Sequence, residues 1–481
     1  MDPISGGFLL FAAVSVLVYY ALPGRARPVW LLIGSLFFYS CSDLRYLFFL
    51  LLSAASCFLA GRALPAAARK KRLLALTLTL NLGLMAVLKL LPYSWDLAGR
   101  LLGLELRTLR FLYPLGISFY SLSAASYLID VYRGEQAPEQ SFWRFLLFLS
   151  FFPVIVQGPI SRYGQLAPQL AEPHALSARN LGFGAQLMLW GFFKKLVIAD
   201  RAAIAVDLVY GSPEGFSGLI IPLMTVLYVF QLYADFSGCV DIFRGLSRML
   251  GIELAENFRR PFFSGSMAEF WRRWHITLGT WLRDYLYFPL GGGRRGRLVK
   301  NRNLLIVFLV SALWHGAGVS FLCWGLLHAF YQIVGGLTRS ARDRFWQRLG
   351  CTSVLPALRA IGCFLLFAFS QHFFRAPGLP AGLHMAAAAL HGPGLSVLRD
   401  GSLLQLGLDA PDLAVLGLSL ALLFFVSLWQ ERHAGVLLRE RLAALPLPLR
   451  WSLWLLGLLA VLIFGVYGPG YSRAQFIYMG F

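Results

Sequence analysis

The chain has 481 residues, of which 58% are hydrophobic and only 14% are charged, and its formal net charge is +20. Soluble domains carry nearer a quarter charged residues, so this composition excludes a soluble globule and predicts a polytopic membrane protein. The basic residues stand in short clusters between apolar runs, so lipid headgroups and cytoplasmic loops explain the charge better than nucleic acid does.

The first apolar run, 8–22, is followed by the first basic residues, Arg25 and Arg27. Positive residues gather in cytoplasmic loops, so we expect the N-terminus outside and this loop inside. The larger basic cluster at 62–72 is also inside if the runs 29–40 and 46–61 both span. No basic segment precedes the first run, which disfavours a cleavable signal peptide.

Further apolar runs follow along the whole sequence. They are 73–91, 111–132, 142–160, 181–199, 203–210, 219–234, 236–251, 303–315, 318–337, 355–374, 413–429 and 451–468. They predict an all-α polytopic protein with roughly ten to twelve transmembrane helices in one integral domain, 1–481. Several runs are too short to cross alone, which indicates re-entrant or cavity-lining segments. The sequence shows no internal repeat, which disfavours a transporter built from repeated halves.

The segment 258–293 carries the clearest local pattern. Ser266 and Glu269 form a capping box, so a helix is expected to begin there. At helical spacing one face is apolar (Phe270, Trp271, Trp274, Leu278, Trp281, Leu282, Tyr285) and the other polar (Glu269, Arg272, Arg273, Thr277, Thr280, Arg283, Asp284). This pattern predicts an amphipathic helix lying in the membrane interface. A surface helix that only anchors a bundle in the membrane would show the same pattern. His275, however, falls on the border of the two faces, where it can reach a buried cavity.

A second histidine stands at the end of an apolar run. The basic stretch 294–302 precedes the run 304–313, which ends in Trp314-His315-Gly316. If a helix starts near Asn303, His315 lies roughly 18 Å into a hydrocarbon core about 30 Å thick. A buried ionisable group usually marks a reaction centre or transport path, and histidine suits a general base. A packing histidine bonded to a neighbouring carbonyl is the equally weighted alternative.

Other polar residues have simpler interpretations. The cysteines (Cys41, Cys57, Cys239, Cys323, Cys351, Cys363) lack paired spacing, so neither a disulfide framework nor a metal site is expected. Asp241 and Arg244 lie three residues apart and are expected to form an internal ion pair.

Several of these segments resemble a known family. Residues 261–264, 269–278 and 281–287 read Pro-Phe-Phe-Ser, Glu-Phe-Trp-Arg-Arg-Trp-His-Ile-Thr-Leu and Trp-Leu-Arg-Asp-Tyr-Leu-Tyr, and 313–318 read Leu-Trp-His-Gly-Ala-Gly. They resemble the two histidine motifs of the membrane-bound O-acyltransferase superfamily. The segments 116–120, 127–134, 231–238 and 476–478 are similar to a bacterial branch. That branch contains the alginate O-acetylation membrane subunit, the closer match, and the D-alanyl transfer protein of lipoteichoic acid. Residues 121–123 and Gln157 depart from its pattern, which leaves substrate detail open.

The resemblance implies a helical bundle around a catalytic tunnel, with interfacial helices on the cytoplasmic side. It assigns the essential catalytic histidine to His315 and the second motif histidine to His275. Trp314, Gly316 and Asp235 are then expected to line the substrate tunnel. Arg272, Arg273 and Arg283 are expected to steer an anionic donor or to contact lipid headgroups. No metal and no permanently bound cofactor is expected.

The implied function is movement of an acyl group, expected to be acetyl, across the bacterial inner membrane. The donor is a cytoplasmic thioester, either acetyl-coenzyme A or a carrier-protein thioester, and the acceptor is a cell-wall or exopolysaccharide hydroxyl outside. Relatives in the acetyl branch work with an extracytoplasmic esterase-type (SGNH) transferase, and this chain carries no Gly-x-Ser-x-Gly elbow, so such a partner is expected. D-alanyl transfer from a carrier protein to teichoic acid is one alternative, and a polysaccharide-precursor transporter is another. The residues do not name the acceptor.

Overall fold

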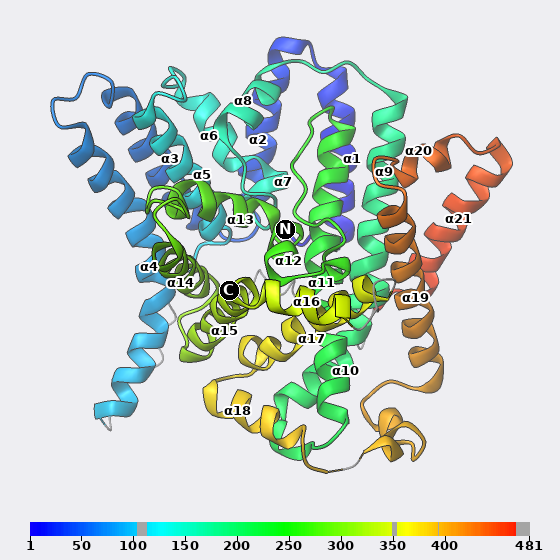
Figure 1. Ribbon diagram of the computed structural model, residues 1–481. Coiled ribbons are helices and arrows are strands. Elements are labelled where there is room, and N and C mark those ends of the chain that lie inside the picture. Colours follow the sequence, from blue (N-terminus) through cyan, green and yellow to red (C-terminus); the bar gives the residue numbers. More distant parts are fainter. Residues whose placement is uncertain (103–112, 349–353, 393, 468–481) are drawn as a thin grey trace. The chain divides into compact units, whose positions relative to one another are not determined.

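The computed structural model describes residues 1–102, 113–348, 354–392 and 394–467, and every regular element within these ranges is a helix (Figure 1). An isolated antiparallel bridge between Phe258 and Trp274 is the only strand-like pairing within them. Cys351 and the motif at 476–478 lie outside the described residues. The predicted all-α class is confirmed.

The described chain forms two compact units, and a boundary between them falls inside helix α11 (Ile220–Met249). Unit 1 contains residues 1–188 and 239–256, and unit 2 contains residues 189–238 and 257–467. The two histidine motifs both belong to unit 2. The prediction of a single integral domain stays a prediction.

The helices that begin in unit 1 are α1 (Gly6–Ala21), α2 (Arg27–Ser40), α3 (Tyr46–Ala63), α4 (Lys70–Leu102), α5 (Ile117–Arg133), α6 (Phe142–Ser150), α7 (Phe152–Ile155), α8 (Tyr163–Ala171) and α9 (Ala178–Phe192). The start of α5 shows how the sequence sets these boundaries. Gly116 precedes it with φ +75°, and a Cβ at that position would lie 1.9 Å from the Ile155 carbonyl oxygen. Only glycine fits both the backbone conformation and the close approach.

Unit 2 contains α10 (Asp200–Gly211), α12 (Met267–Arg273), α13 (Ile276–Leu282), α14 (Arg297–His315), α15 (Val319–Leu337), α16 (Arg339–Arg348), α17 (Leu355–Arg375), α18 (Leu379–Ala388), α19 (Ala410–Arg432), α20 (Leu438–Ala443) and α21 (Leu447–Phe464). It also contains two π-helices, Phe193–Ala199 and Arg283–Tyr287. Short 3₁₀ turns complete the described part of the chain at Gly24–Ala26, Pro213–Gly215, Pro261–Phe263, Leu395–Leu398 and Ser402–Gln405.

Seven helices in the described part are long and apolar enough to cross a membrane. They are Tyr46–Ala63, Lys70–Trp95, Ile220–Met249, Val319–Leu337, Leu355–Arg375, Ala410–Arg432 and Leu447–Phe464. The apolar helix α1 is shorter. The chain is therefore a multi-pass membrane protein, while the count of ten to twelve spans stays a prediction.

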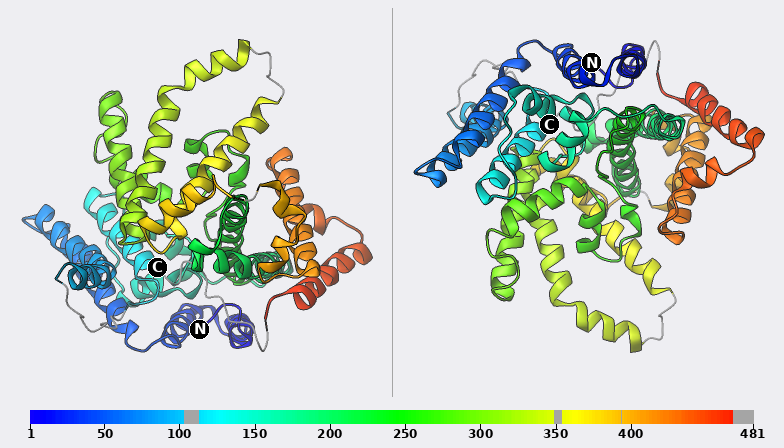
Figure 2. Two further views of the ribbon diagram at one scale, coloured as in Figure 1. Left: turned by 90° about the horizontal axis from the view of Figure 1, so that it is seen from below. Right: turned by 90° about the horizontal axis from the view of Figure 1, so that it is seen from above.

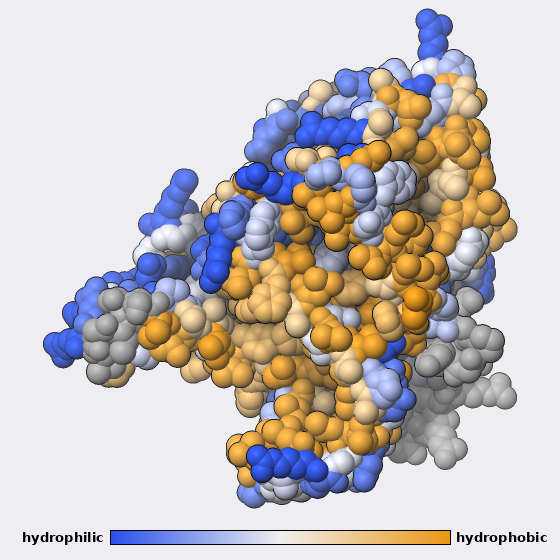
Figure 3. All heavy atoms as spheres, turned by 90° about the vertical axis from the view of Figure 1, so that its right-hand side faces the viewer, coloured by the Kyte–Doolittle hydropathy of each residue, from blue (hydrophilic) through white to orange (hydrophobic). Residues whose placement is uncertain are grey.

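An extended apolar surface lies over the last helices. Figure 3 shows apolar side chains gathered over the face that carries α19 and α21. On α21 alone Leu455, Leu456, Leu458 and Leu459 are all exposed. Such a surface is stable against lipid tails, where exposed leucine has no hydration cost.

Helices α14, α15 and α17 pack side by side and hold the second histidine motif (Figure 2). Gly325 of α15 allows a close approach, because a Cβ there would lie 2.7 Å from the Phe308 carbonyl oxygen of α14. Small residues at such crossings let membrane helices approach backbone to backbone.

Two sequence predictions about helix boundaries are wrong. The runs 219–234 and 236–251 are one continuous helix, α11, rather than two segments. The amphipathic helix is capped by Ser266 as predicted, with the Ser266 side chain accepting from the Glu269 N–H at 3.2 Å, but it ends at Arg273. A new helix, α13, begins only after His275. Helical periodicity continues through the break, so the pattern did not reveal it.

Candidate functional site

His315 is the last residue of α14 and is 3% exposed. Its Nδ1 lies 2.7 Å from the Ser311 carbonyl oxygen. A carbonyl only accepts hydrogen bonds, so Nδ1 carries the ring proton of the neutral histidine and Nε2 carries the lone pair. The helix C-terminus also carries partial negative charge, which stabilises an imidazolium formed there. The hydrogen bond to a neighbouring carbonyl that a packing histidine would make is thus present. The same hydrogen bond leaves the lone pair on Nε2, the form that a base requires.

Aromatic rings enclose this imidazole. The ring centroids of Trp314, Trp324 and Phe374 lie 4.9, 5.0 and 5.6 Å from that of His315. Gly316 follows directly, and a Cβ there would lie 2.2 Å from the Phe321 ring. Gly316 is therefore required for packing beside His315. An apolar enclosure excludes water, which strengthens electrostatic interactions with a bound substrate.

His275 lies at the junction of α12 and α13 in the left-handed conformation, with φ 44°. Among non-glycine residues in the described ranges only Arg260 shares a positive φ. Such backbone conformations cost about 1–3 kcal/mol and gather at functional sites. The junction is held in place by Asn257, whose carbonyl oxygen accepts from the Ile276 N–H at 3.0 Å and whose side chain accepts from the Thr277 N–H at 3.1 Å.

The two histidines share a neighbour. The Trp314 ring lies 5.7 Å from His275 and 4.9 Å from His315, and Phe236 of α11 lies 4.9 Å from His275 on another side. His275 is 1% exposed. The structure therefore brings His275 together with Trp314 and His315, which lie about 40 residues later in the sequence.

The buried position of His275 gives a testable pH dependence. Burial lowers the pKa of His275 well below its ordinary value of 6.5, and the neighbouring His315 lowers it further. The folded protein keeps this ring neutral, whereas the unfolded chain binds a proton below about pH 6.5. The stabilisation is thus fully present above that pH and is lost below it, by at most about 1.4 kcal/mol per pH unit. We expect the melting temperature to fall from about pH 7.5 to about pH 5.5, and to fall less in His275→Gln.

The matched control is His433→Gln, because His433 is exposed at the end of α19. It should keep the wild-type pH dependence. If His275→Gln retained the full wild-type dependence, His275 would not be the group that titrates.

Asp235 lies elsewhere in unit 2, in a buried charge cluster. Its carboxylate lies 2.7 Å from Lys195 Nζ, which also lies 2.8 Å from Asp200. Lys194 Nζ donates to Ser237 Oγ at 2.8 Å. Both lysines belong to the π-helix Phe193–Ala199, and the four charged groups sum to zero. The structure gives Asp235 this ion-pair role, and its place in a substrate tunnel stays a prediction.

The predicted arginines have different surroundings. Arg273 contacts Glu269 at 2.7 Å and Glu431 at 2.9 Å. Arg283 contacts Asp284 at 2.8 Å and remains about half exposed, and Arg272 is exposed. Arg272 and Arg283 thus offer positive charge at the surface, while Arg273 mainly joins α12 to α19.

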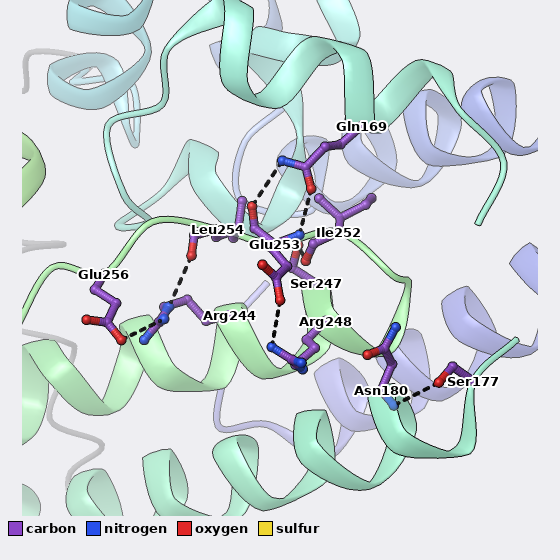
Figure 4. Close-up of polar contacts among 10 residues, drawn as sticks. All are labelled: Gln169, Ser177, Asn180, Arg244, Ser247, Arg248, Ile252, Glu253, Leu254 and Glu256. Atoms are coloured by element: carbon purple, nitrogen blue, oxygen red, sulfur yellow. Dashed lines mark hydrogen bonds and ion pairs between the residues drawn. The ribbon is translucent and has the colours of Figure 1, made fainter. Parts of the chain in front are cut away.

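The predicted pair of Asp241 and Arg244 is confirmed at 3.6 Å and belongs to a polar network in unit 1. Figure 4 shows Arg244 reaching Glu256 and the Leu254 carbonyl, Arg248 reaching Glu253, and the Gln169 side chain bonding the Glu253 backbone twice. These contacts fix the loop that follows α11.

Sequence reasoning missed two groups of buried polar residues. Lys194 and Lys195 lie inside the run 181–199, which we counted only as apolar. His328, Ser370 and Gln371 lie inside the runs 318–337 and 355–374, and all three are at most 1% exposed. The signal in the sequence was the presence of polar residues within apolar segments. Burying such residues in a membrane costs free energy, so they usually have a functional role.

Comparison with known proteins agrees with the geometry. Residues 73–369 match the family described as MBOAT, membrane-bound O-acyltransferase family. A probable alginate O-acetylase of Pseudomonas syringae pv. tomato is 37% identical over 334 residues, which cover 68% of this chain and 64% of that protein. A peptidoglycan O-acetyltransferase of Helicobacter pylori is 34% identical over 66% of this chain and 67% of its own length. A teichoic acid D-alanyltransferase of Bacillus subtilis is 29% identical over 45% of this chain and 57% of its own length.

Proposed function

This chain belongs to the membrane-bound O-acyltransferase family, and we propose from that premise that it transfers acetyl groups from a cytoplasmic thioester to a polysaccharide hydroxyl outside the bacterial inner membrane. Family membership confirms the predicted enzyme class, acyltransferase, over a polysaccharide-precursor transporter. The observation that carries the proposal is the geometry of His315, whose basic Nε2 faces away from the Ser311 carbonyl inside an aromatic enclosure.

The proposed reaction uses His315 as general base. Nε2 accepts the proton of the acceptor hydroxyl while its oxygen attacks the thioester carbonyl carbon. When the tetrahedral intermediate collapses, the carbon–sulfur bond breaks and the thiolate takes the proton back from the imidazolium. The new bond is an ester, and the products are the acetylated acceptor and the free thiol.

His275 supplies a neutral ring beside this centre. With its pKa lowered by burial, it serves as an N–H donor rather than as a cation. In that form it stabilises the negative charge that develops on the thioester oxygen, or holds the donor in place. The left-handed backbone at His275 sets the ring direction independently of helix periodicity.

Charge distribution supports the direction of transfer. The basic stretch 294–302 runs into the first turns of α14, and α16 carries Arg339, Arg342, Arg344 and Arg348. By the positive-inside rule the start of α14 and the helix α16 both face the cytoplasm, where thioester donors are made. The same rule applied to Arg25 and Arg27 puts the N-terminus outside. Arg272 and Arg283 are available to a donor phosphate or to lipid headgroups. An extracytoplasmic esterase-type transferase is the proposed partner for the final acceptor.

The relatives favour acetyl over D-alanyl as the acyl group. The alginate and peptidoglycan O-acetylation relatives match about two thirds of the chain at 34–37% identity, whereas the D-alanyl relative matches less than half at 29%. D-alanyl transfer remains the alternative that an experiment must exclude.

The deciding experiment is label transfer in vesicles that hold the full chain. Radiolabelled acetyl-coenzyme A and a D-alanyl carrier-protein thioester are supplied separately on the face bearing residues 294–302. Alginate, peptidoglycan and teichoic acid fragments, together with a purified extracytoplasmic SGNH-type transferase, are enclosed on the other face. We expect hydroxide-labile label on a polysaccharide from acetyl-coenzyme A and none in empty vesicles. Label only from the D-alanyl donor would overturn the acetyl proposal.

A further inference from the structure

A second polar cluster lies one helical turn from the His315 enclosure. Trp324 of α15 contacts His315 at 5.0 Å and His328 at 4.8 Å between ring centroids. His328 is four residues further along α15, toward the basic helix α16. It therefore lies roughly 6 Å from Trp324 along the axis of α15, on the side from which the proposed cytoplasmic donor approaches.

Hydrogen bonds fix the protonation of His328. Ser370 Oγ donates to the Phe367 carbonyl oxygen at 2.6 Å and accepts from Gln371 Nε2 at 3.0 Å. His328 Nε2 lies 3.0 Å from the same oxygen. Ser370 has a single hydroxyl proton, already given to Phe367, so His328 Nε2 must be the donor. The other nitrogen, Nδ1, then carries a lone pair.

Four polar atoms around this point have no hydrogen-bond partner within the described ranges. They are His328 Nδ1, Gln371 Oε1, Trp324 Nε1 and Trp271 Nε1, and each is buried. The first two are acceptors and the indole nitrogens are donors. The Trp271 ring lies 5.0 Å from His328, so α12, α15 and α17 converge here. Each such orphan costs about 1–3 kcal/mol, so a native protein is expected to satisfy them with a bound group.

We propose that His328, with Trp324 and Trp271, forms a subsite for a secondary amide of the acyl donor. An amide offers one N–H for His328 Nδ1 and one carbonyl for an indole N–H, which matches the two kinds of unsatisfied atom. Coenzyme A and carrier-protein thioesters both carry such an amide two carbons from the sulfur. The span from thioester carbon to amide nitrogen is four bonds, roughly 5–6 Å when extended. Both imidazole rings contact the Trp324 ring, at 5.0 and 4.8 Å between centroids, so a donor whose thioester reaches His315 carries this amide past the same indole toward His328.

This inference rests on the proposed function and can fail separately from it. Two small acetyl donors that differ only at the amide N–H measure the contribution of that group. S-acetyl-N-acetylcysteamine keeps the amide, and S-acetyl-2-mercaptoethyl acetate replaces its N–H with oxygen while keeping the carbonyl. The measured quantity is the ratio of kcat/KM for the two donors. The ratio does not change when a variant merely contains less folded protein.

We expect the wild type to prefer the amide donor about tenfold, the effect of one hydrogen bond to a buried acceptor. His328→Phe should bring the ratio close to one. Ser370→Ala is a milder change that removes the hydrogen bond fixing the tautomer of His328, so it should lower the ratio in part. It also tests the subsite if His328→Phe does not fold. The control His384→Phe, at an exposed histidine of α18, should keep the wild-type ratio.

Two outcomes would overturn the subsite while leaving acetyl transfer intact. The first is a wild-type ratio near one, which would mean that bound water satisfies these atoms. The second is an unchanged ratio in both His328→Phe and Ser370→Ala. Absence of acetyl transfer from either small donor and from acetyl-coenzyme A would overturn the proposed function, and the subsite with it.

Discussion

Replacing His315 with alanine is expected to lower acetyl transfer by a factor of about 10² to 10⁴. The imidazole Nε2 is the base of the proposed reaction, and nearby aromatic side chains offer no substitute. His315→Gln, which preserves more of the side-chain volume, should be equally inactive, because an amide does not take up the proton. Initial rates of labelled acetyl transfer in vesicles, normalised to folded protein, measure the effect.

His433 provides a close control for this substitution. Its Nδ1 also lies against the carbonyl oxygen four residues earlier, that of Trp429, at 2.9 Å, but the side chain is exposed. His433→Ala removes the same local hydrogen bond and should leave transfer unchanged. Normal activity of both His315 variants would contradict the assignment of His315 as base, and would make its carbonyl bond purely a packing feature.

Replacing Lys195 with methionine is expected to destabilise the protein by about 3–5 kcal/mol. Lys195 is 1% exposed and bridges Asp200 and Asp235, which are 7% and 2% exposed. Without its charge, two buried carboxylates face each other with Lys194 as the remaining cation. Thermal unfolding of the purified protein, followed by loss of monodisperse protein on heating, measures the change.

A double substitution separates charge from packing. Adding Asp235→Asn to Lys195→Met removes one of the two carboxylates left uncompensated, so the double variant should lose less stability than the sum of the single variants. Lys70→Met, at an exposed position at the start of α4, should change stability little. Strict additivity would show that the cluster contributes through packing rather than through charge.

These predictions draw on different levels of information. His315 could be proposed as a functional residue from the sequence, because a basic stretch, an apolar run and a terminal histidine follow in order, and membrane burial of an ionisable group is rarely neutral. The capping box at Ser266 placed the start of α12 correctly, since a cap depends on residues only three apart. The ion pair of Asp241 and Arg244 was predictable for the same reason.

The break at His275 was not predictable in this way. The residues on both sides keep helical periodicity, and the left-handed turn depends on Asn257, some twenty residues earlier, which binds the backbone of α13. The partners of Asp235 were equally hidden. Lys195 and Asp235 are forty residues apart, and nothing in either segment indicates the other.

The sequence by itself thus determined the membrane class and the family and singled out the two histidines as candidates, because these depend on composition and on short motifs. Tertiary structure alone decided which nitrogen of His315 lies against the Ser311 carbonyl, how His275 reaches Trp314, and which buried charges compensate one another. It also revealed the unsatisfied atoms around His328. Those features arise where helices distant in sequence meet in a low-dielectric interior, where the cost of an unpaired polar group depends on its partners in space.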